Sequence, residues 1–333
     1  MSTSSKRAPL PGWPGDSSPF HAGEQALQSR AGVRERAERA GRRTIRDFMP
    51  DEHRELFEKL PYVVLGSLDT GGRPWASILA GRPGFLRTPD ATTLEINAWP
   101  QAGDPLAANL APGAPLGVLG IEFETRRRNR MNGIVAETRG GGFAVRVRQS
   151  FGNCPQYIQA RTARFEASPE RAAPAPETEG GSLSAAAEAF VRGADTFFIA
   201  SASPGARGGS PSEGVDVSHR GGRPGFVRVD RVEGRSVLTA PDFSGNAMFN
   251  TLGNLALDPR AGLLFVDFSA GTLLTLIGRT EIVWDGPEVA AFAGAQRLLK
   301  FHVEGGVRLG GALPLRWSPP VYAPQLAATG RWA

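Results

Sequence analysis

The chain has 333 residues, of which 41% are hydrophobic and 21% are charged, a composition typical of globular rather than disordered proteins. It contains no run of about 18 uncharged apolar residues, so the sequence predicts no membrane-spanning helix. The single cysteine, Cys154, excludes an internal disulfide and a metal site made of several thiolates.

The charge pattern narrows the classes of partner. The net charge of +5 is carried mainly by arginines scattered along the chain, with one dense run at Arg126–Arg128. Such a surface attracts phosphorylated small molecules, and we expect neither a nucleic-acid nor a membrane partner. The N-terminal residues lack the apolar segment of a secretory signal, so we expect a cytoplasmic protein.

Residues 1–53 are predicted to form an N-terminal arm followed by helices. Residues 1–20 have no apolar periodicity, whereas the Arg/Glu-rich stretch from Glu24 has helical spacing. A second helix is expected from Pro50, with Asp51 as its N-cap. We interpret these helices as solvated elements that pack on the first domain.

Residues 54–167 contain a series of short β-like runs bounded by turn residues. Strands at such short spacing, without long helices between them, are typical of an antiparallel barrel or sandwich. The predicted fold class is therefore mostly β with short helices, a β-barrel of the α+β type. The predicted strands are Tyr62–Leu65, Trp75–Leu79, Gly84–Arg87, Leu94–Ala98, Leu116–Phe123 and Met131–Glu137.

Residues 168–192 are predicted to be a linker and a helix, and residues 193–333 a second β-rich unit with a C-terminal extension. Residues 168–181 are rich in Pro, Ala, Glu and Gly and have little to bury, and a helix is expected at Ser182–Arg192. Another short helix should end at Asp258-Pro259. The predicted strands are Phe197–Ala200, Gly214–Ser218, Gly225–Val229, Ser236–Thr239, Gly262–Phe268 and Leu273–Trp284.

Two segments of the chain are nearly identical: GRPGFLR at 81–87 and GRPGFVR at 222–228. Farther along, residues 108–123 align with residues 253–268 without a gap. A period of about 140 residues is far longer than the roughly 20–50 residues of solenoid and propeller repeats. The repeat therefore predicts two copies of a whole domain.

The copies differ directly after a shared serine. Ser77 is followed by Ile78-Leu79-Ala80, whereas Ser218 is followed by His219-Arg220-Gly221. Core packing does not demand a titratable ring and a guanidinium, so this exchange places function in the second copy. Taken alone, His219 is more typical of a structural hydrogen-bonding residue than of a general base.

A polar loop in the second copy adds to this difference. Ser244, Gly245, Asn246, Asn250 and Thr251 surround a turn that opens a helix. Backbone N–H groups at a helix start suit an anion such as phosphate, and a nearby arginine adds a forked, charged donor. The alternative is that the serine and the first asparagine only cap the helix while the glycine makes its turn.

At these residues the sequence resembles the pyridoxamine 5′-phosphate oxidase-like family of FMN-binding split barrels, in its tandem two-barrel branch. The resembling pattern is a strand ending in Ser218, the PGFVRV strand, a strand ending LTAPD, and a short helix ending NLALDPRAGLLF. The segment Gly152–Ile158, GNCPQYI, also resembles that branch. Where the family commonly has Ser-Arg-Lys at the phosphate, this chain has Phe249-Asn250-Thr251, so both cations are missing.

The resemblance implies two tandem FMN-binding split barrels that form a pseudo-dimer within one chain, as a monomer or as a homodimer. Residues 54–167 would be the degenerate copy and residues 193–333 the flavin-binding copy, with one flavin per chain and no metal. Trp75, Ser77 and Arg126–Arg128 would supply the facing wall. The implied cofactor-binding residues are Ser218, His219, Arg220, Gly221, Pro241, Asp242, Asn246, Asn250 and Thr251.

The implied function is an FMN-dependent oxidoreductase that acts on a small molecule, with NAD(P)H as a candidate electron donor. No catalytic residue is assigned, and His219 is the single candidate for a base. One alternative is a non-catalytic flavin-nucleotide carrier or sensor, and another is a split barrel that binds haem or a deazaflavin. Cys154 is interpreted as a small core residue, the alternative being a reactive thiol near the flavin.

Overall fold

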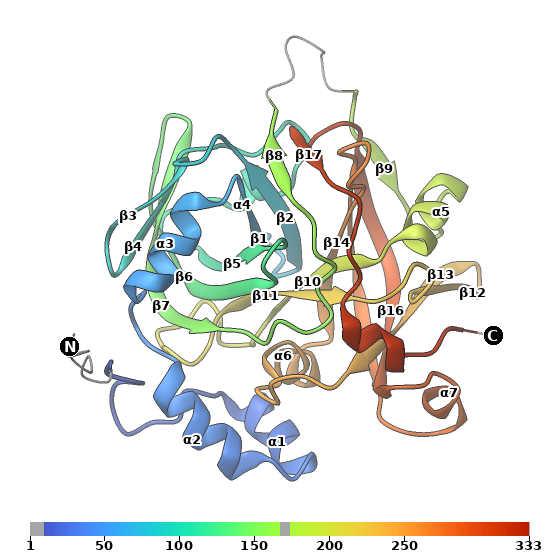
Figure 1. The fold of residues 1–333 in the computed structure, drawn as a ribbon, viewed down its shortest axis with the longest axis horizontal. Coiled ribbons are helices and arrows are strands. Elements are labelled where there is room, and N and C mark those ends of the chain that lie inside the picture. The colour runs from blue at the N-terminus through green and yellow to red at the C-terminus, as the bar shows by residue number, and fades with distance from the viewer. Residues whose placement is uncertain (1–9, 167–173, 333) are drawn as a thin grey trace, which may run out of the picture.

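The computed structural model describes residues 10–166 and 174–332, so part of the predicted arm and part of the predicted linker lie outside the described residues. Two antiparallel sheets make up most of the molecule, and short helices lie around them (Figure 1). Within the described ranges, no helix is both long enough and apolar enough to cross a membrane. The predicted fold class, mostly β with short helices, is confirmed.

The first sheet has seven strands in the order β2-β1-β5-β6-β7-β4-β3. Helix α3 (Asp51–Lys59) packs on it, with Leu56 and Phe57 fully buried in the core of this sheet. The short helix α4 (Leu106–Asn109) precedes β5. The strands are β1 (Tyr62–Leu68), β2 (Pro74–Ala80), β3 (Leu86–Asp90), β4 (Thr93–Ile96), β5 (Pro115–Glu122), β6 (Arg127–Arg139) and β7 (Gly142–Gly152).

The second sheet repeats this strand order, β11-β10-β14-β15-β16-β13-β12, and β9 (Glu177–Glu179) pairs with β16. Helix α5 (Ala185–Gly193) leads into it, and its N-cap is Ser184, whose hydroxyl accepts from the backbone N–H of Ala187. The domain boundaries proposed from the sequence stay a prediction. The strands are β10 (Thr196–Ala202), β11 (Val215–Gly221), β12 (Arg228–Val232), β13 (Arg235–Phe243), β14 (Arg260–Val266), β15 (Leu273–Val283) and β16 (Ala295–Leu309).

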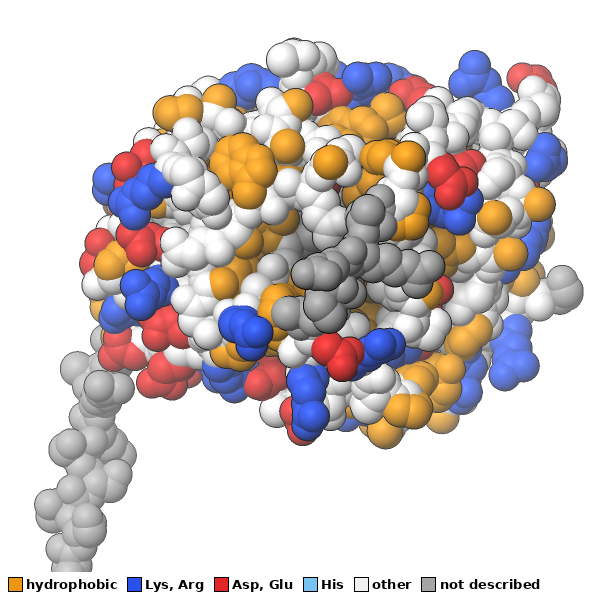
Figure 2. All heavy atoms as spheres, turned by 90° about the horizontal axis from the view of Figure 1, so that it is seen from above, with side chains coloured by type: hydrophobic (Ala, Val, Ile, Leu, Met, Phe, Trp, Pro, Cys, Tyr) orange, Lys and Arg blue, Asp and Glu red, His pale blue; other side chains and the backbone are white. Residues whose placement is uncertain are grey.

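Smaller elements complete the second half of the chain. Helix α6 (Asn250–Leu257) precedes β14, and α7 (Pro287–Ala290) precedes β16. Strands β8 (Ala163–Phe165) and β17 (Leu315–Trp317) pair with each other, and a 3-10 turn, η1, spans Pro324–Ala328. On the face in Figure 2, basic and acidic side chains are interspersed around the rim, with apolar side chains between them.

The two sheets meet through reciprocal contacts of equivalent strands, β5 on β11 and β14 on β2. Glycines allow the backbones to approach: a Cβ at Gly117 would lie 2.6 Å from the carbonyl oxygen of Val215. A Cβ at Gly262 would lie 2.4 Å from that of Pro74. These two glycines occupy matching positions in the aligned repeats. The two halves of the chain therefore contact each other through equivalent strands, with an apolar cluster between them.

Helix α1 (Ala22–Arg30) lies against α6, and α2 (Arg34–Thr44) contacts α1 (Figure 1). Helix α1 begins with a capping box, in which His21 Nδ1 accepts from Gly23 N and Glu24 accepts from His21 N. A Cβ at Gly23 would lie 2.2 Å from the carbonyl oxygen of Gly253, so the helices touch backbone to backbone. The expectation that all N-terminal helices pack on the first domain is wrong for α1, because its glycine face fits α6 of the second half.

Candidate functional site

A cavity of about 240 Å³ lies where β6 of the first half faces β11 of the second half. A smaller cavity of about 50 Å³ adjoins it and shares several lining residues. The larger cavity is lined by Ser218, His219, Arg220, Asp242, Asn246, Asn250 and Thr251, and the smaller one also by Gly221 and Pro241. The structure thus brings all the residues predicted to bind the cofactor to two neighbouring cavities.

Arginines from three strands line the larger cavity: Arg128 and Arg130 from β6, Arg220 from β11 and Arg297 from β16. Asp242 is the one carboxylate in the described lining. Burial and the neighbouring guanidiniums lower the pKa of Arg128, and burial is also the main cause that lowers the pKa of Arg130. With Arg36 of α2, these arginines outnumber the one carboxylate, so the described lining carries a net positive charge.

Asp242 lies between two of these arginines. Its Oδ1 is 3.5 Å from Arg220 Nη2, and its Oδ2 is 3.3 Å from Arg297 Nε. The side chain of Arg297 is only 7% exposed, and its Nη1 has no hydrogen-bond partner among the described residues. Its guanidinium carbon lies 5.1 Å from the ring centre of Phe249 and 5.0 Å from that of Trp284. These two rings hold the guanidinium at the cavity wall.

The loop before α6 does not have the geometry expected from the sequence. The helix is preceded by Phe249, which has a φ of 64° and makes no side-chain cap. Asn246 Oδ1 accepts from the backbone N–H of Met248 at 3.2 Å, so it closes a local turn instead of capping the helix. Capping by Ser244 or Asn246 is therefore wrong.

The polar side chains at the start of α6 are occupied by other parts of the protein. Thr251 and Ser218 share a hydrogen bond of 2.8 Å, and Arg130 Nη2 donates to the same Ser218 hydroxyl. Asn250 Nδ2 donates to Glu24 of α1. Gln28, also of α1, donates to the carbonyl oxygen of Met248 at 2.9 Å. Helix α1 thus satisfies Asn250, which the sequence analysis assigned to the cofactor, and Ser218 satisfies Thr251.

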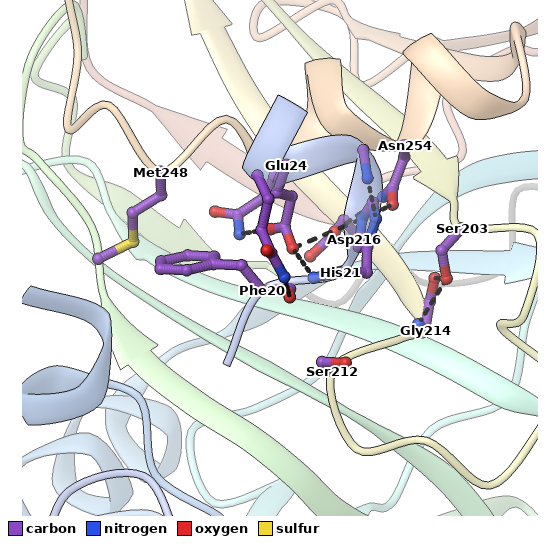
Figure 3. A network of polar contacts seen from close by, with 12 residues as sticks. Phe20, His21, Glu24, Ser203, Ser212, Gly214, Asp216, Met248 and Asn254 are labelled. Carbon is purple, nitrogen blue, oxygen red and sulfur yellow. Dashed lines mark hydrogen bonds and ion pairs between the residues drawn. The ribbon is translucent and has the colours of Figure 1, made fainter. Parts of the chain in front are cut away.

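A buried polar network joins α1, α6 and both sheets (Figure 3). Asp216 Oδ1 accepts from Arg130 at 2.9 Å and from Asn132 at 2.7 Å. Its Oδ2 accepts from Asn254 Nδ2 at 2.9 Å. This carboxylate therefore receives three donors and balances a guanidinium that is 4% exposed.

Two titratable groups, His21 and Glu24, lie at the N-terminal end of this network, and burial shifts the pKa of each. Because His21 Nδ1 accepts from Gly23 N, its proton lies on Nε2, which donates to Asn254 Oδ1 at 2.8 Å. Burial lowers the pKa of this histidine. Burial also raises the pKa of Glu24 well above its usual value, and the nearby Asp216 adds to the shift.

His219 is among the lining residues of both cavities, but its ring packs against aromatic side chains of the apolar cluster between the two sheets. Side chains alternate along a strand, so Ser218 and Arg220 share the cavity face of β11, and His219 lies on the opposite, apolar face. Its ring is edge-on to Phe123 and Phe198 at 5.9 and 5.8 Å, and neither ring nitrogen has a described hydrogen-bond partner. Burial, with Arg128 and other cations, lowers its pKa well below its usual value. This placement disfavours a general base.

Of the residues predicted to form the facing wall, Arg128 lines both cavities, and the others do not line either of them. Arg128 Nε donates to the carbonyl oxygen of Cys154 at 2.7 Å, and Cys154 lines the smaller cavity. Arg126 instead donates to the carbonyl oxygen of Ile158 at 3.0 Å, and Trp75 donates to Asp69 at 3.2 Å. These two side chains therefore contact other parts of the protein.

The equivalent residues on and beside β2 have different chemistry. Ser77, the counterpart of Ser218, donates to Asp104 at 2.6 Å. Asn109 donates to Ser67 at 2.9 Å, which repeats the bond of 3.1 Å from Asn254 to Ser201 in the second half. The architectural bond is thus shared by both halves, whereas the arginine cluster belongs to the groove beside β11.

Sequence reasoning missed Arg130, Arg297, Asp216 and Glu24. Arg297 lies on β16, a strand that the sequence analysis did not predict. A signal was available for Asp216, because it stands two residues before Ser218 and therefore on the same strand face. No local pattern places Glu24 against α6.

No family model matches the chain, and no curated protein matches it either. Among solved structures, a provisionally assigned pyridoxamine 5′-phosphate oxidase of Lactobacillus delbrueckii is 15% identical, with 32% of this chain and 95% of that chain covered and a TM-score of 0.25. A FAD-binding protein of Mesorhizobium loti is 14% identical, with coverages of 40% and 97% and a TM-score of 0.24. The haem storage protein HutZ of Vibrio cholerae is 12% identical, with coverages of 37% and 91% and a TM-score of 0.23. These likenesses are too weak to assign a family, so the functional argument rests on the residues.

Proposed function

We propose that the chain is an FMN-binding flavoprotein, built from two split barrels that form an internal pseudo-dimer, and that it acts as an oxidoreductase on a small molecule. The observation that carries the proposal is the gathering of Arg128, Arg220 and Arg297 around one carboxylate, Asp242, at the meeting of the two halves. Guanidiniums that line a partly buried cavity suit a phosphate, because they offer charged, forked donors.

The donor set fits the phosphate end of a flavin nucleotide. Arg297 keeps an unpartnered buried N–H in the lining, and such a group is costly unless a ligand satisfies it. The volume of about 240 Å³ is below the roughly 300–1,000 Å³ of most small-molecule sites, and residues Ala31, Val33 and Arg36 form one wall. A whole flavin nucleotide therefore needs this wall to move outward.

FMN supplies hydride and electron transfer when bound, and the protein supplies binding and orientation. Arg220 and Arg297 would hold the phosphate, and Arg128 on the facing strand would add charge from the other half. Ser218, Thr251 and Arg130 form a hydrogen-bonded floor that keeps the two halves in register. A proton-transferring residue is left unassigned, because the His219 ring lies on the apolar face of β11.

Binding is tested by titrating the purified chain with FMN and following the quenching of flavin fluorescence. We expect one FMN per chain and a binding curve that weakens with added salt. Arg220→Ala should weaken binding. Arg228→Ala is the matched control, because its side chain is 30% exposed, against 27% for Arg220, and it pairs with Asp230 and Glu288 outside the cavity. Equal affinities of the two variants would argue against this site.

A non-catalytic flavin-nucleotide carrier or sensor is the second candidate. It is favoured because the His219 ring, the one candidate for a general base, lies on the apolar face of β11. The two functions separate in one experiment, in which the FMN-loaded protein is mixed with NADPH or NADH without oxygen. Bleaching of the flavin absorbance, followed by recovery on admission of oxygen, supports the oxidoreductase. A flavin that binds but stays oxidised supports the carrier. If the purified protein has the absorbance spectrum of haem or of a deazaflavin, that cofactor takes the place of FMN in either proposal.

A further inference from the structure

The start of α6, where the resemblance implies the phosphate, has little left to offer an anion. Asn250 donates to Glu24, Thr251 is bonded to Ser218, and Asn246 accepts from a backbone N–H. The carboxylate of Glu24 itself stands beside the first turn of the helix, and its residue is 3% exposed. A phosphate there would meet the buried carboxyl group of Glu24 and would find the side-chain donors of Asn250 and Thr251 already engaged.

The arginines elsewhere in the cavity lining have N–H groups that no acceptor among the described residues satisfies. Arg297 Nη1 is buried without a partner, and Arg297 Nε lies 3.3 Å from Asp242 Oδ2 without the alignment of a hydrogen bond. Arg220 approaches the other oxygen of the same carboxylate only at 3.5 Å. Both guanidiniums therefore face the cavity with N–H groups that Asp242 does not satisfy.

The charge of the wall indicates the class of anion. Arg128, Arg220 and Arg297 carry three positive charges against the one negative charge of Asp242, and Arg130 is neutralised separately by Asp216. Two positive charges are left over on these strands, and Arg36 of α2, which also lines the cavity, adds another. A phosphomonoester carries about −1.5 to −2 at pH 7 and has three acceptor oxygens, so it matches this excess better than a carboxylate does.

We infer that the ligand's phosphomonoester binds to a cluster centred on Arg297, with Arg220 and Arg128, rather than at the N-terminus of α6. This inference rests on the proposed function and identifies the group that would discriminate FMN from riboflavin. Arg297, from β16, replaces the two cations that the loop at 249–251 lacks. The aromatic rings of Phe249 and Trp284 keep it in place when the ligand is absent.

The test compares FMN with riboflavin, which lacks the phosphate, in Arg297→Met and Arg297→Lys. A hydrogen bond to a charged group contributes roughly 1.5–3 kcal/mol, so the Met variant should lose about tenfold to hundredfold in FMN affinity. Its riboflavin affinity should stay unchanged, and the Lys variant should recover part of the loss. Arg308→Met is the control on the same strand, since Arg308 pairs with Glu177 away from the cavity.

Two results would overturn the inference. One is an Arg297→Met protein, folded by circular dichroism, that prefers FMN over riboflavin as strongly as the unchanged chain. The other is an Asn250→Ala variant that loses this preference while Arg297→Met keeps it, which would place the phosphate at α6.

Failure of the proposed function is distinguishable from failure of the inference. If the chain binds no flavin, thermal melting in inorganic phosphate against chloride of equal ionic strength still tests the anion site. A rise in melting temperature that Arg297→Met abolishes supports the Arg297 cluster without FMN. A rise that survives in this variant, or no rise in the unchanged chain, counts against it.

Discussion

The buried pair of Arg130 and Asp216 should control the stability of the whole molecule, because it joins β6 of one half to β11 of the other. The side chains are 4% and 9% exposed, and their N–O distance is 2.9 Å. Asp216→Ala would leave the guanidinium buried without its counter-charge and remove an acceptor from Asn132 and Asn254. Removing one partner of a buried ion pair costs about 3–5 kcal/mol, a large part of the roughly 5–15 kcal/mol that stabilises a typical domain.

The assay is urea unfolding followed by far-ultraviolet circular dichroism, with the free energy of unfolding extrapolated to water. Glu35→Ala is the control, because Glu35 pairs with Arg39 on the surface, with side chains 90% and 70% exposed, and exposed pairs contribute little. Its unfolding curve should overlay that of the unchanged chain.

A double variant separates charge from packing. Arg130→Met with Asp216→Leu removes both charges and keeps the space filled, so it should cost less than Asp216→Ala alone. The reasoning is refuted if Asp216→Ala unfolds like the unchanged chain. It is equally refuted if the double variant is less stable than the single one, since an unpaired charge would then not be the cause.

Three further changes test other parts of the structure. Gly23→Ala places a Cβ 2.2 Å from the carbonyl oxygen of Gly253 and should cost about 1–3 kcal/mol, with faster proteolysis of residues 20–45 as the direct readout. Gly117→Ala should cost a similar amount, about 1–3 kcal/mol, because its Cβ would meet the backbone of Val215, and a melting temperature within error of the unchanged chain would contradict the packing of the halves. Burial lowers the pKa of His53 from 6.5 to about 4, so its neutral form stabilises the fold. That stability is complete above pH 6.5 and declines by about 3 kcal/mol as the pH falls to 4, and His53→Gln should flatten this part of the stability curve.

Much of the fold could be predicted because its signals are local. Turn residues and short apolar runs marked β1 to β6 and β10 to β15, and each prediction overlaps an observed strand. The strands β7 and β16 were missed although they are long. Charged residues interrupt β16, which contains Arg297, Lys300 and Glu304, so its apolar positions form no compact run. Missing β16 also removed Arg297 from the predicted site.

The face of His219 could have been predicted as well. Val215, Val217 and His219 alternate with Asp216, Ser218 and Arg220 along β11, and the two valines identify the apolar face. Reading this period of two would have removed the histidine as a candidate base and added Asp216 to the site. The local pattern was sufficient here, but the sequence analysis did not use it.

By itself, the sequence determined the mostly β class, the repeated anchors around GRPGF, and the contrast between Ile78-Leu79-Ala80 and His219-Arg220-Gly221, because each depends on neighbours along the chain. Only the tertiary structure decided that α1 covers α6, that Glu24 occupies Asn250, and that Arg297 joins Arg220 and Arg128. These residues lie more than 70 positions apart in the sequence, and the shortest separation is that between Arg220 and Arg297. No periodicity in the sequence encodes such a separation. Packing of whole elements brings the side chains together, and the charge of the cavity follows from that packing.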